Sequence, residues 1–240
     1  MTADWLAPRI KLCGISSTHD LAVAVEAGLD AIGVIVGTSH VAEDSLSVEA
    51  AARLLPGVPK GTVTVLVTHL RDPGSILEIA ELLDVTTIQL HGCPSAKAMR
   101  QIQARSGGRN VTRAIHVNAP EPESEAATFA PLCDGIHLDT RTASRLGGTG
   151  QTHDWSISAN IVDRLHRRGC PCILAGGLTP DNVEAAIRTV RPYGVDLNSG
   201  VESARGDKSR ALVHAFVKRA RECARPIGPG SLDSDPLGCR

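Results

Sequence analysis

The chain has 240 residues, a formal net charge of -1 at pH 7 and a hydrophobic fraction of 42%, enough apolar material for one large core. Aromatic residues make up only 2% and no basic cluster occurs, which excludes a nucleic-acid surface built on stacked rings or positive charge. The seven cysteines are scattered, and the start of the chain has no long apolar run, so we expect a cytoplasmic protein without disulfides, signal peptide or membrane span.

Short apolar runs alternate with amphipathic segments along the chain. The sequence predicts strands at residues 10–13, 31–36, 62–67, 86–90, 110–117, 135–138, 172–175 and 195–198. It predicts a helix after each strand, the first starting at Ser16–Thr18 and ending near Gly28, the others at 48–55, 73–83, 95–105, 121–130, 157–168, 180–190 and 208–223. Polar loops are expected at 37–45 and 139–154.

This order gives eight β-then-α units. Strands that are apolar throughout are typical of a parallel sheet buried on both faces. Eight such units favour a single (β/α)8 TIM barrel over an open doubly wound sheet. We assign the barrel to residues 1–223 and expect residues 224–240, which are rich in Gly, Pro and Ser, to form a disordered tail.

Two consecutive loops near the C-terminus break into small residues after an apolar run. Gly176-Gly177 follows the seventh predicted strand, and Asn198-Ser199-Gly200 follows the eighth. Glycine lets backbone N–H groups approach an anion, and barrels commonly bind phosphate at the loops after their last two strands. Tight turns alone would explain one such loop; two in succession predict a phosphate site.

Catalytic groups in this fold lie at the C-terminal ends of strands. Cys13 follows Lys11 and could act as nucleophile or thiolate base, or be a packed thiol. Asp139 could be a general acid or an ordinary ion-pairing aspartate. The glycine-rich loop 146–150, with Gly148 at its centre, could close over a ligand or be a plain linker. Further polar residues at or near strand ends are His69, Gln89, His91, Arg113, His116, Asp196 and Ser199.

The histidines do not have the spacing of a metal site. His91 either lines the pocket or is a satisfied histidine at the barrel rim. His69, His116, His137 and His153 are too far apart in sequence to form a recognisable ligand set, and we assign no metal.

Five motifs follow one another along the chain: KLCGIS, IQLHG, HLDT followed by GGTGQTHDW, LAGGLTPDNV, and GVDLNSGVES with Asp207-Lys208. Together they resemble the phosphoribosylanthranilate isomerase family of tryptophan biosynthesis. The resemblance implies an Amadori rearrangement of an N-aryl phosphoribosylamine without a cofactor. It implies Cys13 as the base at the sugar C2 and Asp139 as the acid at the ring oxygen. We expect substrate contacts from Lys11, Gln89, His91, Arg113, Gly148, Gly176, Gly177, Asp196, Ser199, Gly200 and His40.

The chain departs from the family pattern after the second strand. Family members carry Ser-Pro-Arg there, and the arginine meets the anthranilate carboxylate. This chain has GVIVGTSHVAEDSLS instead, without arginine. Protonated His40 or Arg113 could replace that cation, while Glu43 and Asp44 either repel the carboxylate or point to solvent.

Three functions therefore remain. They are the family isomerase, a paralogous isomerase of another phosphoribosylated amine, and a non-catalytic phosphosugar-binding protein. We expect a small phosphosugar as the partner, with no nucleic acid or membrane, and either a monomer or a homodimer.

Overall fold

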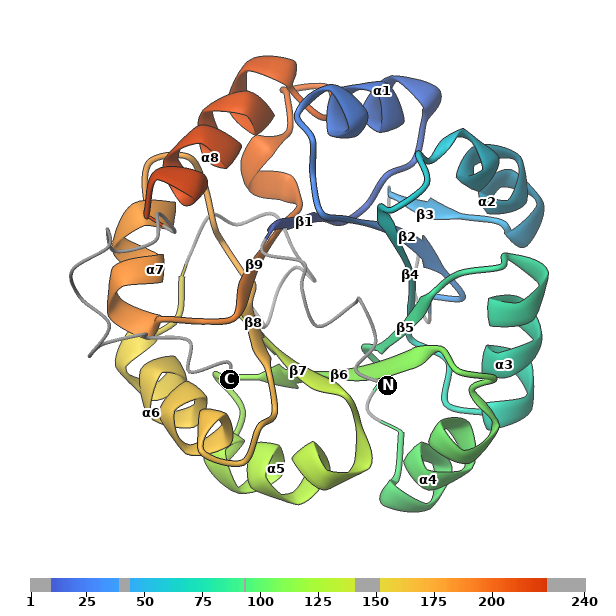
Figure 1. The fold of residues 1–240 in the computed structure, drawn as a ribbon, viewed down its shortest axis with the longest axis vertical. Helices are drawn as coiled ribbons and strands as arrows, with labels where there is room; N and C mark the ends of the chain where they lie inside the picture. The colour runs from blue at the N-terminus through green and yellow to red at the C-terminus, as the bar shows by residue number, and fades with distance from the viewer. Residues whose placement is uncertain (1–9, 39–43, 93, 141–151, 224–240) are drawn as a thin grey trace.

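The computed structural model describes residues 10–38, 44–92, 94–140 and 152–223. Eight parallel strands form a closed ring in its centre, with the helices around the outside (Figure 1). Strand β1 closes the ring because Lys11 aligns with Ala31 of β2 on one side and with Asp196 of β9 on the other. The predicted TIM barrel is confirmed. The ring strands are β1 (Ile10–Leu12), β2 (Ala31–Val36), β4 (Val63–Thr68), β5 (Thr87–Leu90), β6 (Asn110–His116), β7 (Gly135–Asp139), β8 (Cys172–Leu174) and β9 (Gly194–Leu197).

The helices begin where the sequence supplies side-chain caps. Ser47 and Asp72 directly precede the predicted helices at 48–55 and 73–83, and they accept hydrogen bonds from the backbone N–H groups of Ala50 (3.2 Å) and Ser75 (2.8 Å). The helices are α1 (Thr18–Glu26), α2 (Val48–Leu54), α3 (Pro73–Leu82), α4 (Ala96–Arg105), α5 (Pro122–Phe129), α6 (Trp155–His166), α7 (Val183–Val190) and α8 (Arg210–Cys223). The 3-10 turns are η2 (Leu55–Gly57), η3 (Ala130–Leu132) and η4 (Ser199–Val201). No helix among the described residues is long and apolar enough to cross a membrane.

Helix α7 starts three residues later than predicted. In the turn before this helix, the side chain of Asn182 folds back onto the preceding residues. It accepts a hydrogen bond from the N–H of Thr179 (2.8 Å) and donates one to the carbonyl of Gly177 (2.9 Å). Asparagine often makes such local bonds in turns. The Asn182 side chain therefore fixes the shape of the glycine loop after β8.

A ninth strand, β3 (Ser45–Leu46), falls where the sequence predicted the end of a polar loop. It pairs parallel to β2 outside the ring, with Ile35 opposite Ser45. Two residues are too few to show the alternation that marks a strand, so only tertiary pairing could reveal it. The pairing places Asp44, the residue before β3, near the C-terminal end of β1 and β2.

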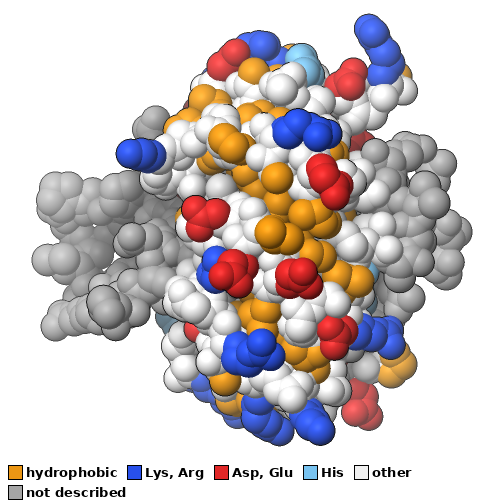
Figure 2. All heavy atoms as spheres, turned by 90° about the vertical axis from the view of Figure 1, so that its right-hand side faces the viewer, with side chains coloured by type: hydrophobic (Ala, Val, Ile, Leu, Met, Phe, Trp, Pro, Cys, Tyr) orange, Lys and Arg blue, Asp and Glu red, His pale blue; other side chains and the backbone are white. Residues whose placement is uncertain are grey.

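The core is mainly aliphatic, as the low aromatic content requires. The outer surface is mixed: Figure 2 shows the face that carries α2 and α3, where apolar atoms lie between acidic and basic side chains. Leu82 on α3 is the most exposed large apolar side chain of the described residues, at 65%. This face carries both signs of charge, in keeping with the near-zero net charge.

Candidate active site

A buried ion pair lies inside the barrel, on the layer below the strand ends. Lys11 of β1 donates to Oδ2 of Asp196 on the neighbouring β9 at 2.7 Å, and their side chains are 1% and 5% exposed. Burial opposes charge on both groups, but their attraction raises the pKa of Lys11 and lowers that of Asp196. His137 of β7 lies 3.6 Å from the same oxygen, and burial lowers its pKa. The sequence predicted Lys11 and Asp196 as substrate contacts; the structure also gives them a partner in each other.

Cys13 follows β1 directly above this pair. Its N–H donates to the carbonyl of Leu197 at 2.8 Å, which holds the residue against β9, and it is 7% exposed. Burial raises the pKa of the Cys13 thiol to about 11, with Asp196 and Asp44 adding to the rise and the Lys11 ammonium opposing it. A Cβ placed on Gly33 would lie 3.1 Å from Nζ of Lys11 and 3.3 Å from Sγ of Cys13, so glycine at this position of β2 leaves room for both groups.

Asp139 ends β7 on a different side of the ring and contacts a histidine. Oδ2 lies 2.9 Å from Nε2 of His91, and Oδ1 accepts from the N–H of Thr140 at 2.7 Å. Burial favours the neutral acid, but the His91 hydrogen bond and charge outweigh it and lower the pKa of Asp139. The structure places His91 at the strand ends beside Asp139, a position that agrees with both interpretations of this residue.

The two small-residue loops lie after neighbouring strands β8 and β9. Gly176 and Gly177 have positive φ angles of 83° and 69°, which favour glycine. A Cβ at Gly200 would collide with the carbonyl oxygen of Leu178, so the two loops also pack tightly against each other. The backbone N–H groups of Gly177 and Gly200 donate to no other described residue. These are the features expected of an anion site at the barrel end.

The structure adds a polar network that the sequence did not predict. Asn198 donates from Nδ2 to Oδ2 of Asp44 at 2.8 Å and accepts at Oδ1 from Nζ of Lys208 at 2.5 Å. Lys208, 1% exposed, also pairs with Glu202 at 2.6 Å. A Cβ on Gly14 would lie 2.6 Å from both the Asp44 carboxylate and the Asn198 amide. Asp44 therefore does not point away to solvent, and its charge acts on the residues after β1. In the sequence, the Asp207-Lys208 pair quoted with the fifth motif was the only signal that drew attention to Lys208.

Other predicted contacts lie elsewhere. Arg113 of β6 lies on the helix side of the sheet: it donates to the carbonyl of Pro94 (2.8 Å), pairs with Glu125 (2.7 Å) and stacks on Phe129 (3.6 Å). The reason is the two-residue period of strands, which puts neighbours of the inward-facing residues on the opposite face. The structure does not bring Arg113 to the other candidates. Gln89 is 3% exposed inside the barrel, and its Oε1 accepts from no described residue. His40 and Gly148 lie outside the described residues.

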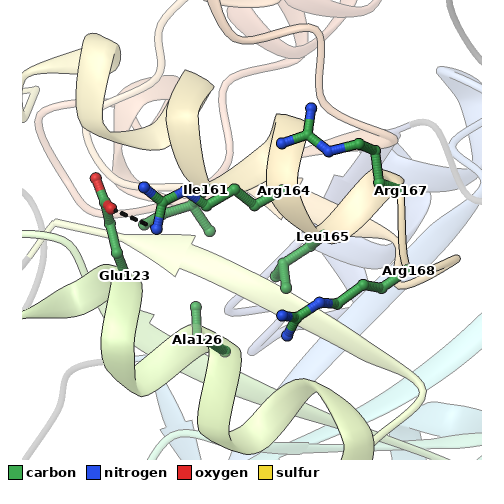
Figure 3. A pocket seen from close by; sticks show the side chains of 8 residues that line it. Glu123, Ala126, Ile161, Arg164, Leu165, Arg167 and Arg168 are labelled. Atoms are coloured by element: carbon green, nitrogen blue, oxygen red, sulfur yellow. Dashed lines mark ion pairs between the residues drawn. The ribbon is translucent and has the colours of Figure 1, made fainter.

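A hollow of about 190 Å³ also occurs away from the strand ends, between α5 and α6 (Figure 3). Its charged groups are surface side chains, with Arg164 paired to Glu123 at 3.0 Å and Arg167 to Asp163 at 2.6 Å. Such exposed pairs are common on surfaces and carry little energy. The chemistry-bearing groups are instead at the barrel end. No group of three His, Cys, Asp or Glu residues that could hold a metal is present in the described part of the chain.

Comparisons with known proteins agree on one family. Residues 10–219 match the family model described as N-(5'phosphoribosyl)anthranilate (PRA) isomerase. A relative from Methanothrix thermoacetophila, N-(5'-phosphoribosyl)anthranilate isomerase, is 36% identical over 90% of this chain and 99% of its own. The crystal structure of phosphoribosyl anthranilate isomerase from Thermotoga maritima matches with a TM-score of 0.79 and 33% identity, over 90% of this chain and 99% of that one. A second, in complex with reduced 1-(o-carboxyphenylamino)-1-deoxyribulose 5-phosphate, matches with a TM-score of 0.74 and 30% identity over the same shares.

Proposed function

Because the chain belongs to the N-(5'-phosphoribosyl)anthranilate isomerase family of tryptophan biosynthesis, we propose that it carries out the Amadori rearrangement with Cys13 as general base and Asp139 as general acid. The observation that carries this assignment is the position of two groups suited to opposite proton transfers, a thiol at the end of β1 and a carboxylate at the end of β7. Asp139 delivers a proton to the furanose ring oxygen, and the C1–O bond breaks to leave a protonated imine. Cys13 removes the C2 proton, which gives an enolamine.

Tautomerisation completes the reaction. The C2 hydroxyl loses a proton and C1 gains one, so the aminoketone product has the same atoms as the substrate and both protein groups recover their starting states. The Lys11 ammonium beside Cys13 favours the thiolate that the base must become, against the effect of burial. The glycine loops at 176–177 and 199–200 offer backbone N–H groups for the substrate phosphate.

The test is turnover of N-(5-phosphoribosyl)anthranilate, followed by the loss of its fluorescence. Cys13→Ala and Asp139→Asn should each lower kcat by about 10²–10⁴-fold, the usual loss for a general acid or base, and leave KM nearly unchanged. Arg167→Ala, at the exposed residue directly after α6, is the matched control. Near-native rates in both variants would show that other groups move the protons.

The position of Asp44 favours a second candidate function, the same rearrangement of a substrate whose aryl group has no carboxylate. The Asp44 carboxylate would repel the carboxylate of an anthranilate ring, and the described residues bring no arginine to Asp44. Comparing kcat/KM for the anthranilate substrate and for its carboxylate-free aniline analogue separates the two. A preference for the first selects the anthranilate isomerase, and a preference for the second selects the paralogue.

A further inference from the structure

Histidines gather around the carboxylate of Asp139. His91, just after β5, is stacked on His69 with ring centroids 5.0 Å apart and an interplanar angle of 21°. His116, at the end of β6, meets the same ring edge-on at 5.1 Å. The 2.9 Å contact from His91 and the 2.7 Å bond from Thr140 together engage both oxygens of Asp139. The carboxylate is thus fixed in place, and one imidazole faces it directly.

A general acid must hold a proton at working pH. Asp139 is poorly suited to do so alone, because its contacts with His91 lower its pKa. Imidazole is the side chain that ordinarily gains and loses a proton near neutral pH. The ring nitrogen against Oδ2 is therefore the nearest source of the proton that Asp139 has to deliver.

We propose that His91 is a positioning residue that supplies, through Asp139, the proton given to the substrate ring oxygen. This inference rests on the proposed function. The proton passes from Nε2 of His91 to Oδ2 of Asp139 and on to the ring oxygen as the C1–O bond breaks, leaving His91 neutral. The proton lost by the C2 hydroxyl during tautomerisation returns by the same two atoms.

The groups around His91 limit the positive charge of the histidine cluster. Two positively charged rings side by side repel each other, so a second positive charge is disfavoured. Among the described residues, the groups close to His91 include Asp139, His69, His116 and His137, and Arg71 donates at 2.9 Å to the carbonyl of the next residue, Gly92. Burial lowers the pKa of His137, and His91 adds to that effect, so His137 stays neutral.

His91→Gln tests the proposal, because glutamine can still donate a hydrogen bond to Asp139 but cannot release a proton. The kcat/KM of the native protein should rise with pH while the thiolate fraction of Cys13 grows and the acid pair stays protonated. It should then level off, because each further gain in thiolate is offset by an equal loss of protonated acid. In His91→Gln the acid is Asp139 alone, so this rise should move below about pH 4 and the plateau should fall about 100-fold. His214→Gln, on the exposed face of α8, should keep the native profile.

Nitrogen NMR of the native protein gives a second measurement that does not depend on a variant folding. The His91 ring should titrate with the midpoint of the low-pH limb of kcat/KM. The proposal would be overturned if kcat/KM of His91→Gln had a lower plateau but rose over the same pH range as that of the native protein. It would also be overturned if the His91 ring did not titrate together with the low-pH rise of kcat/KM. A native protein without any turnover would overturn the proposed function along with it.

Discussion

The charge on Asp44 should control how readily Cys13 becomes a base. The pKa of Cys13 is raised from 9.0 to about 11, which means about 100-fold less thiolate at neutral pH. Burial is the largest cause, and Asp196 and Asp44 follow as the charges that raise it. Asp44→Asn removes one of these charges. The new amide oxygen can still accept the 2.8 Å hydrogen bond from Asn198, so the geometry is retained.

Since Asp44 makes the smallest of the three contributions that raise this pKa, we expect Asp44→Asn to raise the thiolate fraction of Cys13 roughly threefold to tenfold below pH 10. The assay is alkylation by iodoacetamide, with modification of the Cys13 peptide followed by mass spectrometry across pH, because only the thiolate reacts at an appreciable rate. The kcat/KM on the plateau should rise by the same factor, since it depends on the same thiolate.

Asp163→Asn on the exposed face of α6 is the matched control and should alter neither rate. An alkylation rate at Cys13 that is unchanged or slower in Asp44→Asn would refute the reasoning, because the charge would then not act on the thiol. Faster alkylation without faster turnover would show instead that Cys13 is not the base.

Two further variants test structural assignments. Arg113→Ala should lower the free energy of unfolding by about 2–4 kcal/mol in urea denaturation, because the contacts with Pro94, Glu125 and Phe129 are lost, and KM should not change. A tenfold higher KM at native stability would instead show that Arg113 contacts the substrate. Gly177→Val should raise KM by at least about tenfold, because φ is 69° and a side chain would crowd the anion. Gly169→Val, also at a φ of 69° but distant from the strand ends, should only destabilise the fold. Equal KM values in the two variants would show that the loop at Gly177 does not bind the phosphate.

The fold was predictable because its signals are local and repeated. The ring strands are short segments rich in apolar residues, and caps such as Ser47 and Asp72 mark helix starts, so the order of elements and the barrel followed from the sequence. The family resemblance is also confirmed, since residues 10–219 match the family model. Strand β3 was missed because a two-residue pairing has no periodicity to detect.

The site was only partly predictable, because contacts between strand ends depend on side-chain direction and on distant partners. Arg113 lies in the middle of β6 and His116 at its end, and their odd spacing of three puts them on opposite faces, so a count along the strand would have separated them. The contact of His91 with Asp139 joins residues 48 positions apart, and the bond from Asn198 to Asp44 joins residues 154 apart. No local pattern encodes either contact.

These long-range contacts divide the proposed chemistry into two halves with opposite electrostatics. At the end of β1, burial and the Asp44 carboxylate hold Cys13 as a thiol, against the pull of the Lys11 ammonium. At the end of β7, His91 holds Asp139 as a carboxylate. Both groups thus rest in the protonation state opposite to the one their proposed role needs. Rate then depends on the small fraction with a thiolate and a proton on the acid pair, which makes Asp44 and His91, rather than the reacting groups themselves, the positions where substitution tunes turnover.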